Sequence, residues 1–177
     1  MAILIEAISV VVRADAILKK FSGGWDAFKQ IVPNKTLRAD GEIAAVGFMT
    51  PVDVQSFINR LKKNGLIFLH NHESMDIAVV DQMRGPTVKC NWLEFGHADW
   101  DGEGHRIAAC RIVDTDVRQI VTPPDWVYEK SLSASFGFQP TEHEQEGLKF
   151  LRHEDGVDIY INALTGKEVY VGRTGET

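Results

Sequence analysis

The chain opens with an apolar run, MAILIEAISVVVRAD, that the fold must bury because water solvates apolar side chains poorly. Three isoleucines precede three consecutive valines at positions 10–12, and β-branched residues favour strands. The run contains Glu6, has no basic residue at its start and stops at Arg13, so it is typical of neither a signal peptide nor a membrane span. We therefore predict a buried β-strand at the start of a cytoplasmic protein.

The segment TPVDVQSFINRLKKNG carries a complete set of helix signals. Thr50 suits the N-cap, Pro51 suits the first helical position, and Asn64 with Gly65 suits the end. Between these ends, apolar residues recur every three or four positions and so lie on one face of a helix. We predict a helix over Pro51–Lys63 that packs this face against the core.

Shorter patterns complete the fold class. Apolar residues at helical spacing predict a helical region over residues 15–31, which the sequence SGG at 22–24 divides into two short helices. The segment TPPDWVY at 122–128 could open another short helix. Strand patterns occur at residues 42–48, 66–69, 75–81, 131–138, on both sides of a loop at 99–104, and at 157–161 and 168–171. We predict an α+β fold, with mostly antiparallel sheet flanked by a few helices.

Two segments of the sequence resemble each other. Residues 65–80, GLIFLHNHESMDIAVV, align without a gap to residues 147–162, GLKFLRHEDGVDIYIN. Before the second copy, Thr141 and Glu144 form a capping box that predicts a helix of one or two turns. Common ancestry and a coincidence of two similar hairpins both remain open. We treat residues 1–177 as a single α+β domain that could comprise two pseudo-repeats, 1–88 and 89–177, sharing one core.

His70 and His72, followed by Glu73, are the first candidates for metal chemistry. Alternate side chains of a strand share a face, so two imidazoles at this spacing could hold zinc or another divalent ion with Glu73. The pair resembles the His-x-His of amidohydrolase-type enzymes, whose barrels are longer than this chain. The aligned copy has Arg152 and Glu154 in place of the histidines. The turn therefore does not need a metal, and we favour an exposed hairpin tip.

A second polar cluster lies in the segment FGHADWDGEGH, and its members are His97, Asp99, Asp101, Glu103 and His105. Acid-rich glycine loops can hold calcium, but the spacing of an EF-hand loop is not met. The glycines supply turn conformations instead. We therefore favour a wide polar hairpin loop over a metal loop.

The charge of the chain limits its partners. A formal net charge of −6 argues against a general nucleic-acid-binding role, because such proteins usually carry a basic patch. The same charge is compatible with a basic protein partner, since complementary fields speed encounter. Cys90 and Cys110 have the spacing of ordinary reduced thiols rather than of a metal site. The sequence does not indicate the oligomeric state.

The sequence contains no G-x-S-x-G, P-loop or G-x-G-x-x-G motif. Four tryptophans lie in or beside turns rich in Gly, Asp or Pro: Trp25, Trp92, Trp100 and Trp126. Half-exposed indoles in such places suit a protein interface, but four tryptophans that close the ends of the core give the same pattern, and we favour that interpretation. We therefore expect a bacterial-type binding protein that regulates or neutralises a partner without catalysis and without a cofactor. The alternative is a small metal-dependent enzyme, glyoxalase-like or a hydrolase, that uses His70 and His72 with a metal such as zinc.

Overall fold

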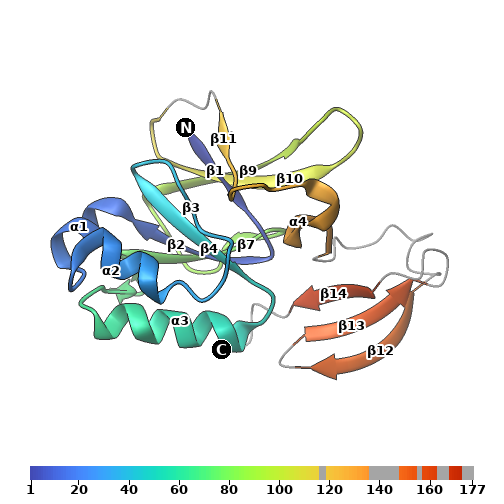
Figure 1. The fold of residues 1–177 in the computed structure, drawn as a ribbon, viewed down its shortest axis with the longest axis horizontal. Coiled ribbons are helices and arrows are strands. Elements are labelled where there is room, and N and C mark those ends of the chain that lie inside the picture. Colours follow the sequence, from blue (N-terminus) through green and yellow to red (C-terminus); the bar gives the residue numbers. More distant parts are fainter. Residues whose placement is uncertain (116–118, 136–147, 155–156, 163–167, 173–177) are drawn as a thin grey trace.

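The computed structural model describes residues 1–115, 119–135, 148–154, 157–162 and 168–172, and these residues form the predicted α+β fold (Figure 1). Three layers are stacked on one another: helices, a five-stranded sheet and a four-stranded sheet. Among the described pairs of named strands, all are antiparallel except the pair of β1 and β11. The prediction of mostly antiparallel sheet is confirmed.

The two large sheets share no strand. The five-stranded sheet has the order β3 (Arg38–Ala39), β4 (Ile43–Phe48), β2 (Ile8–Arg13), β7 (Ile77–Asp81) and β8 (Gly85–Pro86). The four-stranded sheet has the order β11 (Ile120–Val121), β1 (Ala2–Ile5), β10 (Arg106–Ile112) and β9 (Leu93–Asp99). The sequence prediction of two strands around a loop at 99–104 is confirmed by β9 and β10.

The opening apolar run supplies a central strand to each sheet. β1 ends at Ile5 and β2 begins at Ile8, so the connection consists of Glu6 and Ala7. Ala7 has a φ of 49°, a left-handed conformation that is uncommon for alanine, at the point where the chain leaves one sheet for the other. The prediction of one continuous strand is wrong here, because the hydrophobic pattern continues through the bend and hides it.

β2 is buried on both faces, which explains its three consecutive valines. Val10 and Val12 pack into the core under the helices, whereas Val11 packs into the core between the two sheets. A strand covered on both sides reads as a continuous apolar run rather than as an alternating one.

Three helices cover the outer face of the five-stranded sheet: α1 (Ala14–Lys20), α2 (Gly24–Ile31) and α3 (Pro51–Lys63). The predicted bounds of α3 and its cap are confirmed, because Thr50 Oγ1 accepts a hydrogen bond from the Asp53 N–H at 3.1 Å. The predicted break between α1 and α2 is also confirmed. The buried stripe of α3 consists of Val54, Phe57, Ile58 and Leu61.

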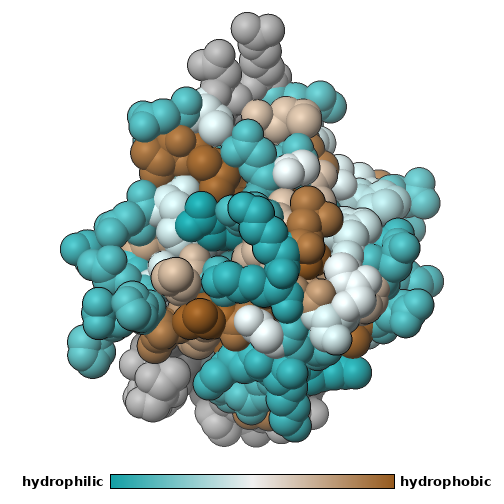
Figure 2. Space-filling view, turned by 90° about the vertical axis from the view of Figure 1, so that its left-hand side faces the viewer, coloured by the Kyte–Doolittle hydropathy of each residue, from teal (hydrophilic) through white to brown (hydrophobic). Residues whose placement is uncertain are grey.

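Figure 2 shows the molecule from the side that carries α1 and α2, where hydrophobic residues form separate patches between hydrophilic ones. One exposed apolar side chain of α1 is Leu18, which is 69% accessible. In the described ranges, no helix combines the length and the apolar character that crossing a bilayer requires.

The segment predicted as a strand at 131–138 begins as helix instead. A 3₁₀ turn, η1 (Tyr128–Lys130), leads into the short helix α4 (Leu132–Ser135), and residues 136–138 lie outside the described part. Ser131 Oγ accepts a hydrogen bond from the Ala134 N–H at 3.2 Å, as an N-cap does. The predicted helix at 122–128 does not begin at Thr122, since the chain turns at Asp125 first.

The two resembling segments differ in their pairing. In the first, a hairpin of β5 (Leu69–His70) and β6 (Glu73–Ser74) leads into β7, which pairs with β2. In the second, β12 (Leu148–Glu154) pairs directly with β13 (Val157–Asn162), and β14 (Glu168–Gly172) adds the predicted C-terminal hairpin. The helix predicted at Thr141 lies outside the described residues. The pseudo-repeats stay a prediction.

Candidate functional site

The hairpin between β5 and β6 places the two predicted histidines in different backbone conformations. His70 is the last residue of β5 and pairs with Glu73, so Asn71 and His72 alone form the turn. Both turn residues have positive φ, 52° and 63°, as a two-residue type I′ hairpin turn requires. The assumption that His70 and His72 share one face of an extended strand is therefore wrong. Both side chains lie at an exposed hairpin tip.

Glu73, the third predicted metal ligand, has other partners. Its carboxylate forms an ion pair with Lys89 Nζ at 3.0 Å and accepts a hydrogen bond from Asn91 Nδ2 at 2.9 Å. Within the described ranges, no three His, Cys, Asp or Glu side chains come together in a way that could hold a metal ion. The metal site at His70, His72 and Glu73 stays a prediction that the described geometry does not assemble.

The acidic loop between β9 and β10 is held by its own carboxylates. Asp99 accepts hydrogen bonds from the N–H groups of Asp101, Gly102 and Gly104, at 3.0–3.3 Å. Asp101 accepts one from the Glu103 N–H at 3.0 Å and contacts His105 Nδ1 at 2.6 Å. These contacts hold the loop as a polar hairpin turn.

This loop also contributes to a cluster of aromatic rings. His105 stacks on Tyr128 with ring centroids 4.3 Å apart, and Trp100 meets Trp126 edge to face at 4.9 Å. The ring centroids of Trp126 and Tyr128 are 6.3 Å apart. The β9–β10 hairpin and the segment before α4 therefore contact each other through these rings.

Carboxylates surround the aromatic rings. Burial raises the pKa of Tyr128, and the nearby carboxylates of Asp101 and Glu129 raise it further. Desolvation alone would raise the pKa of Asp101, but hydrogen bonds from Glu103 and His105 lower it overall. The two segments, 99–106 and 125–130, carry five carboxylates against two cations, Arg106 and Lys130. We name the acidic–aromatic surface by six residues: Trp100, Asp101, Glu103, Trp126, Tyr128 and Glu129.

A buried polar cluster lies directly behind this surface. Glu6 is 1% exposed, and its Oε1 accepts hydrogen bonds from Trp126 Nε1 at 2.6 Å, Ser133 Oγ at 3.1 Å and Ser133 N at 3.4 Å. Gln82, which has no exposed surface, accepts a hydrogen bond from Ala7 N at 2.8 Å and donates one to Ser133 O at 3.0 Å. The cluster thereby ties α4 and Trp126 to the bend between β1 and β2.

Sequence reasoning missed this cluster because its members are far apart in the chain. Glu6 and Ser133 are separated by 127 positions. The sequence offered one signal, a carboxylate inside an otherwise apolar run, since a buried charge needs polar partners. It gave no indication of which partners those are.

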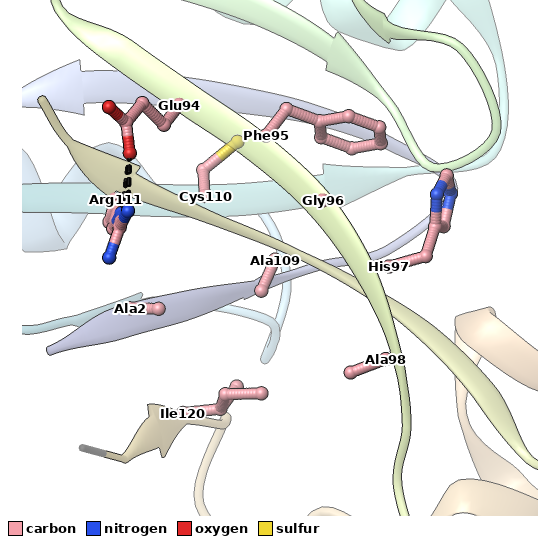
Figure 3. A pocket seen from close by; sticks show the side chains of 10 residues that line it. All are labelled: Ala2, Glu94, Phe95, Gly96, His97, Ala98, Ala109, Cys110, Arg111 and Ile120. Atoms are coloured by element: carbon pink, nitrogen blue, oxygen red, sulfur yellow. Dashed lines mark hydrogen bonds and ion pairs between the residues drawn. The ribbon is translucent and has the colours of Figure 1, made fainter. Parts of the chain in front are cut away.

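A hollow on the four-stranded sheet, about 280 Å³ in volume, has a different character (Figure 3). Small side chains on β9 and β10 leave the sheet surface open, among them Gly96, Ala98 and Ala109. An ion pair between Glu94 and Arg111 at 2.6 Å borders it. His97 belongs to the opposite face of β9 and contacts Gln82 O at 2.7 Å. The hollow shows no pairing of a nucleophile with a base among the described residues.

The two cysteines do not have the properties of reactive nucleophiles. Both are free thiols, Cys110 is buried and Cys90 is half-buried. Burial raises the pKa of each thiol above its ordinary value, which disfavours the reactive thiolate.

Comparison with known proteins gives no relative: no protein-family model, no curated protein and no solved structure matches the chain.

Proposed function

We propose that this protein is a non-catalytic binding protein that regulates or neutralises a basic protein partner, and that the acidic–aromatic surface is its binding site. The observation that carries the proposal is the meeting of Trp100 and Trp126 beside a carboxylate-rich loop. The same two indoles come from segments 26 positions apart, so the fold itself assembles this surface.

The residue types at this surface are those that contribute most to protein binding. Trp100 is 41% exposed although tryptophan is usually largely buried, and Trp and Tyr dominate interface hot spots. Carboxylates around such anchors steer a positively charged partner toward the surface and repel an acidic one. The internal hydrogen bonds of the Asp99–Asp101 loop keep these groups in place, so little conformational freedom is lost on binding.

The proposal is tested by capture and titration of a basic partner from the native cytoplasm. We expect a protein of high pI to bind the wild type and to bind Trp100→Ala at least roughly 30-fold more weakly, which corresponds to the loss of a hot spot of about 2 kcal/mol. Its affinity for the wild type should also fall as salt is raised, because salt screens exposed charges.

The matched control is Leu18→Ala, which removes an exposed apolar side chain from the remote face of α1. It should leave the affinity unchanged. A partner that binds wild type and Trp100→Ala equally well, or substrate turnover that a pocket variant abolishes, would contradict the proposal.

We further infer a cytoplasmic location and no role in nucleic-acid binding, on the basis of two unpaired cysteines and the acidic balance of the chain. The alternative of a metal-dependent enzyme has no specific observation in its favour among the described residues.

A further inference from the structure

A pocket of about 250 Å³ opens beside the acidic–aromatic surface. Its lining includes Glu6, Thr36, Trp126 and Val127, so Trp126 belongs both to the surface and to the pocket. Val127 is 50% exposed and lies at the solvent side, whereas Glu6 is 1% exposed and lies at the inner side. The pocket therefore connects the proposed binding surface to a buried carboxylate.

The two oxygens of that carboxylate differ in their contacts. Oε1 accepts hydrogen bonds from Trp126 and Ser133. No hydrogen bond to Oε2 is found among the described residues, where Ser74 Oγ is the one fully enclosed side-chain polar atom without a partner, so Oε2 keeps contact with the pocket that Glu6 lines. A carboxylate oxygen at the inner end of a pocket can accept a hydrogen bond from a bound group, and a charged donor gives the strongest one.

Arg38, a buried cation that feels the charge of Glu6, does not supply this donor. Arg38 is 2% exposed, and its guanidinium donates to Leu4 O at 2.7 Å, Thr36 O at 2.9 Å and Ser9 Oγ at 2.7 Å. Burial lowers the pKa of Arg38 to about 10, while the charge of Glu6 acts in the opposite direction. Arg38 thus stays charged at neutral pH and balances Glu6 through space, without occupying Oε2.

Two lysines also line the pocket, Lys35 and Lys130. Both are exposed, so their aliphatic stems can form the wall while their ammonium groups remain in water. The inner end of the pocket is consequently more favourable to a cation than the rim is.

We infer that this pocket accepts the guanidinium group of one arginine side chain of the basic partner, which donates to Glu6 Oε2 and packs against the indole of Trp126. The inference rests on the proposed function, since the arginine belongs to that partner. Arginine fits better than lysine because its planar group is weakly hydrated, stacks on aromatic rings and donates in a fixed fork.

The test uses three lysine-rich peptides that differ at one central residue: arginine, lysine or citrulline. Citrulline keeps the shape of arginine but has no charge, and lysine keeps the charge but not the shape. Wild type should bind the arginine peptide at least roughly tenfold more tightly than the other two. Glu6→Gln should abolish that preference, and Glu42→Gln, which removes an equal charge from an exposed site, should retain it.

A second variant covers the case in which the buried substitution prevents folding. Val127→Phe narrows the solvent side of the pocket without entering the core, and it should also abolish the arginine preference. In parallel, N-acetyl-argininamide is added to the wild type while the indole N–H resonance of Trp126 is followed by NMR. A saturable shift, lost in Val127→Phe, is expected.

The outcomes separate the two proposals. Peptides that bind with equal affinity whatever their central residue, and that Trp100→Ala weakens, would overturn the arginine pocket and leave the binding surface standing. An indole resonance that argininamide does not shift would also overturn the pocket. A shift without any peptide binding would support the pocket and count against a lysine- and arginine-rich partner.

Discussion

Gln82→Leu is the substitution whose effect follows most directly from the geometry. The side chain of Gln82 has no exposed surface and bridges two parts of the fold, the bend at Ala7 and the short helix α4. Leucine has a similar volume, so the change removes hydrogen bonds without leaving a large cavity. It should therefore report on the polar cluster rather than on packing.

The magnitude follows from the two groups that lose their partner. Ala7 N and Ser133 O would both lose the hydrogen bond that the Gln82 side chain provides, and each such loss at a buried group costs about 1–3 kcal/mol. The more favourable burial of leucine offsets part of this cost. We expect the free energy of unfolding to fall by about 2–4 kcal/mol.

Urea unfolding, followed by tryptophan fluorescence, measures the change, and the slope of free energy against urea should stay constant. The matched control is Gln55→Leu on α3, where the glutamine is exposed and its hydrogen bond to Asn59 is at the surface. The control should change stability by less than about 0.5 kcal/mol. Equal effects of the two substitutions would refute the reasoning.

Three further predictions concern local geometry. Thr50→Ala should lower the free energy of unfolding by about 1 kcal/mol, whereas Thr50→Ser, which keeps the capping oxygen, should not. Gly65→Ala places a methyl group 2.6 Å from a backbone oxygen of α1, while Gly41→Ala, at a similar φ, meets nothing within 4 Å. In the same urea assay the first should therefore be more destabilising by about 1–3 kcal/mol, and equal losses would show that the contact relaxes freely. Calorimetric titration should give wild type and the double variant His70→Ala with His72→Ala the same zinc affinity, and a stoichiometric site lost in the variant would favour the metal-dependent enzyme.

Local chemistry made part of the fold predictable. The helix over Pro51–Lys63 was encoded by its own cap, stripe and stop, all within sixteen consecutive residues. The division of α1 from α2 and the β9–β10 hairpin were likewise marked by glycines at the turns. In each case the signal and the structure lie in the same short segment, so no tertiary information is needed.

Features that depend on distant contacts could not be predicted. The residues on both sides of Glu6 and Ala7 are buried, those of β1 in one sheet and those of β2 in the other. The apolar pattern therefore predicts one uninterrupted strand and does not reveal the bend. The alternating pattern at residues 131–138 suggested a strand, but Ser133 donates a hydrogen bond to the Glu6 carboxylate, a partner that only the folded chain brings close. His72 adopts positive φ in a two-residue turn, which moved it off the strand face that its spacing implied.

The bend at Ala7 has a consequence for how the molecule opens. β1 and β2 follow each other in the sequence with only Glu6 and Ala7 between them, yet each occupies an interior position in a different sheet. Because the connection is two residues long, unfolding of one sheet should displace the interior strand of the other sheet as well. Amide protons of β1 and β2 should consequently exchange with solvent at the same slow rate, as one cooperative unit, rather than as two subdomains of unequal protection.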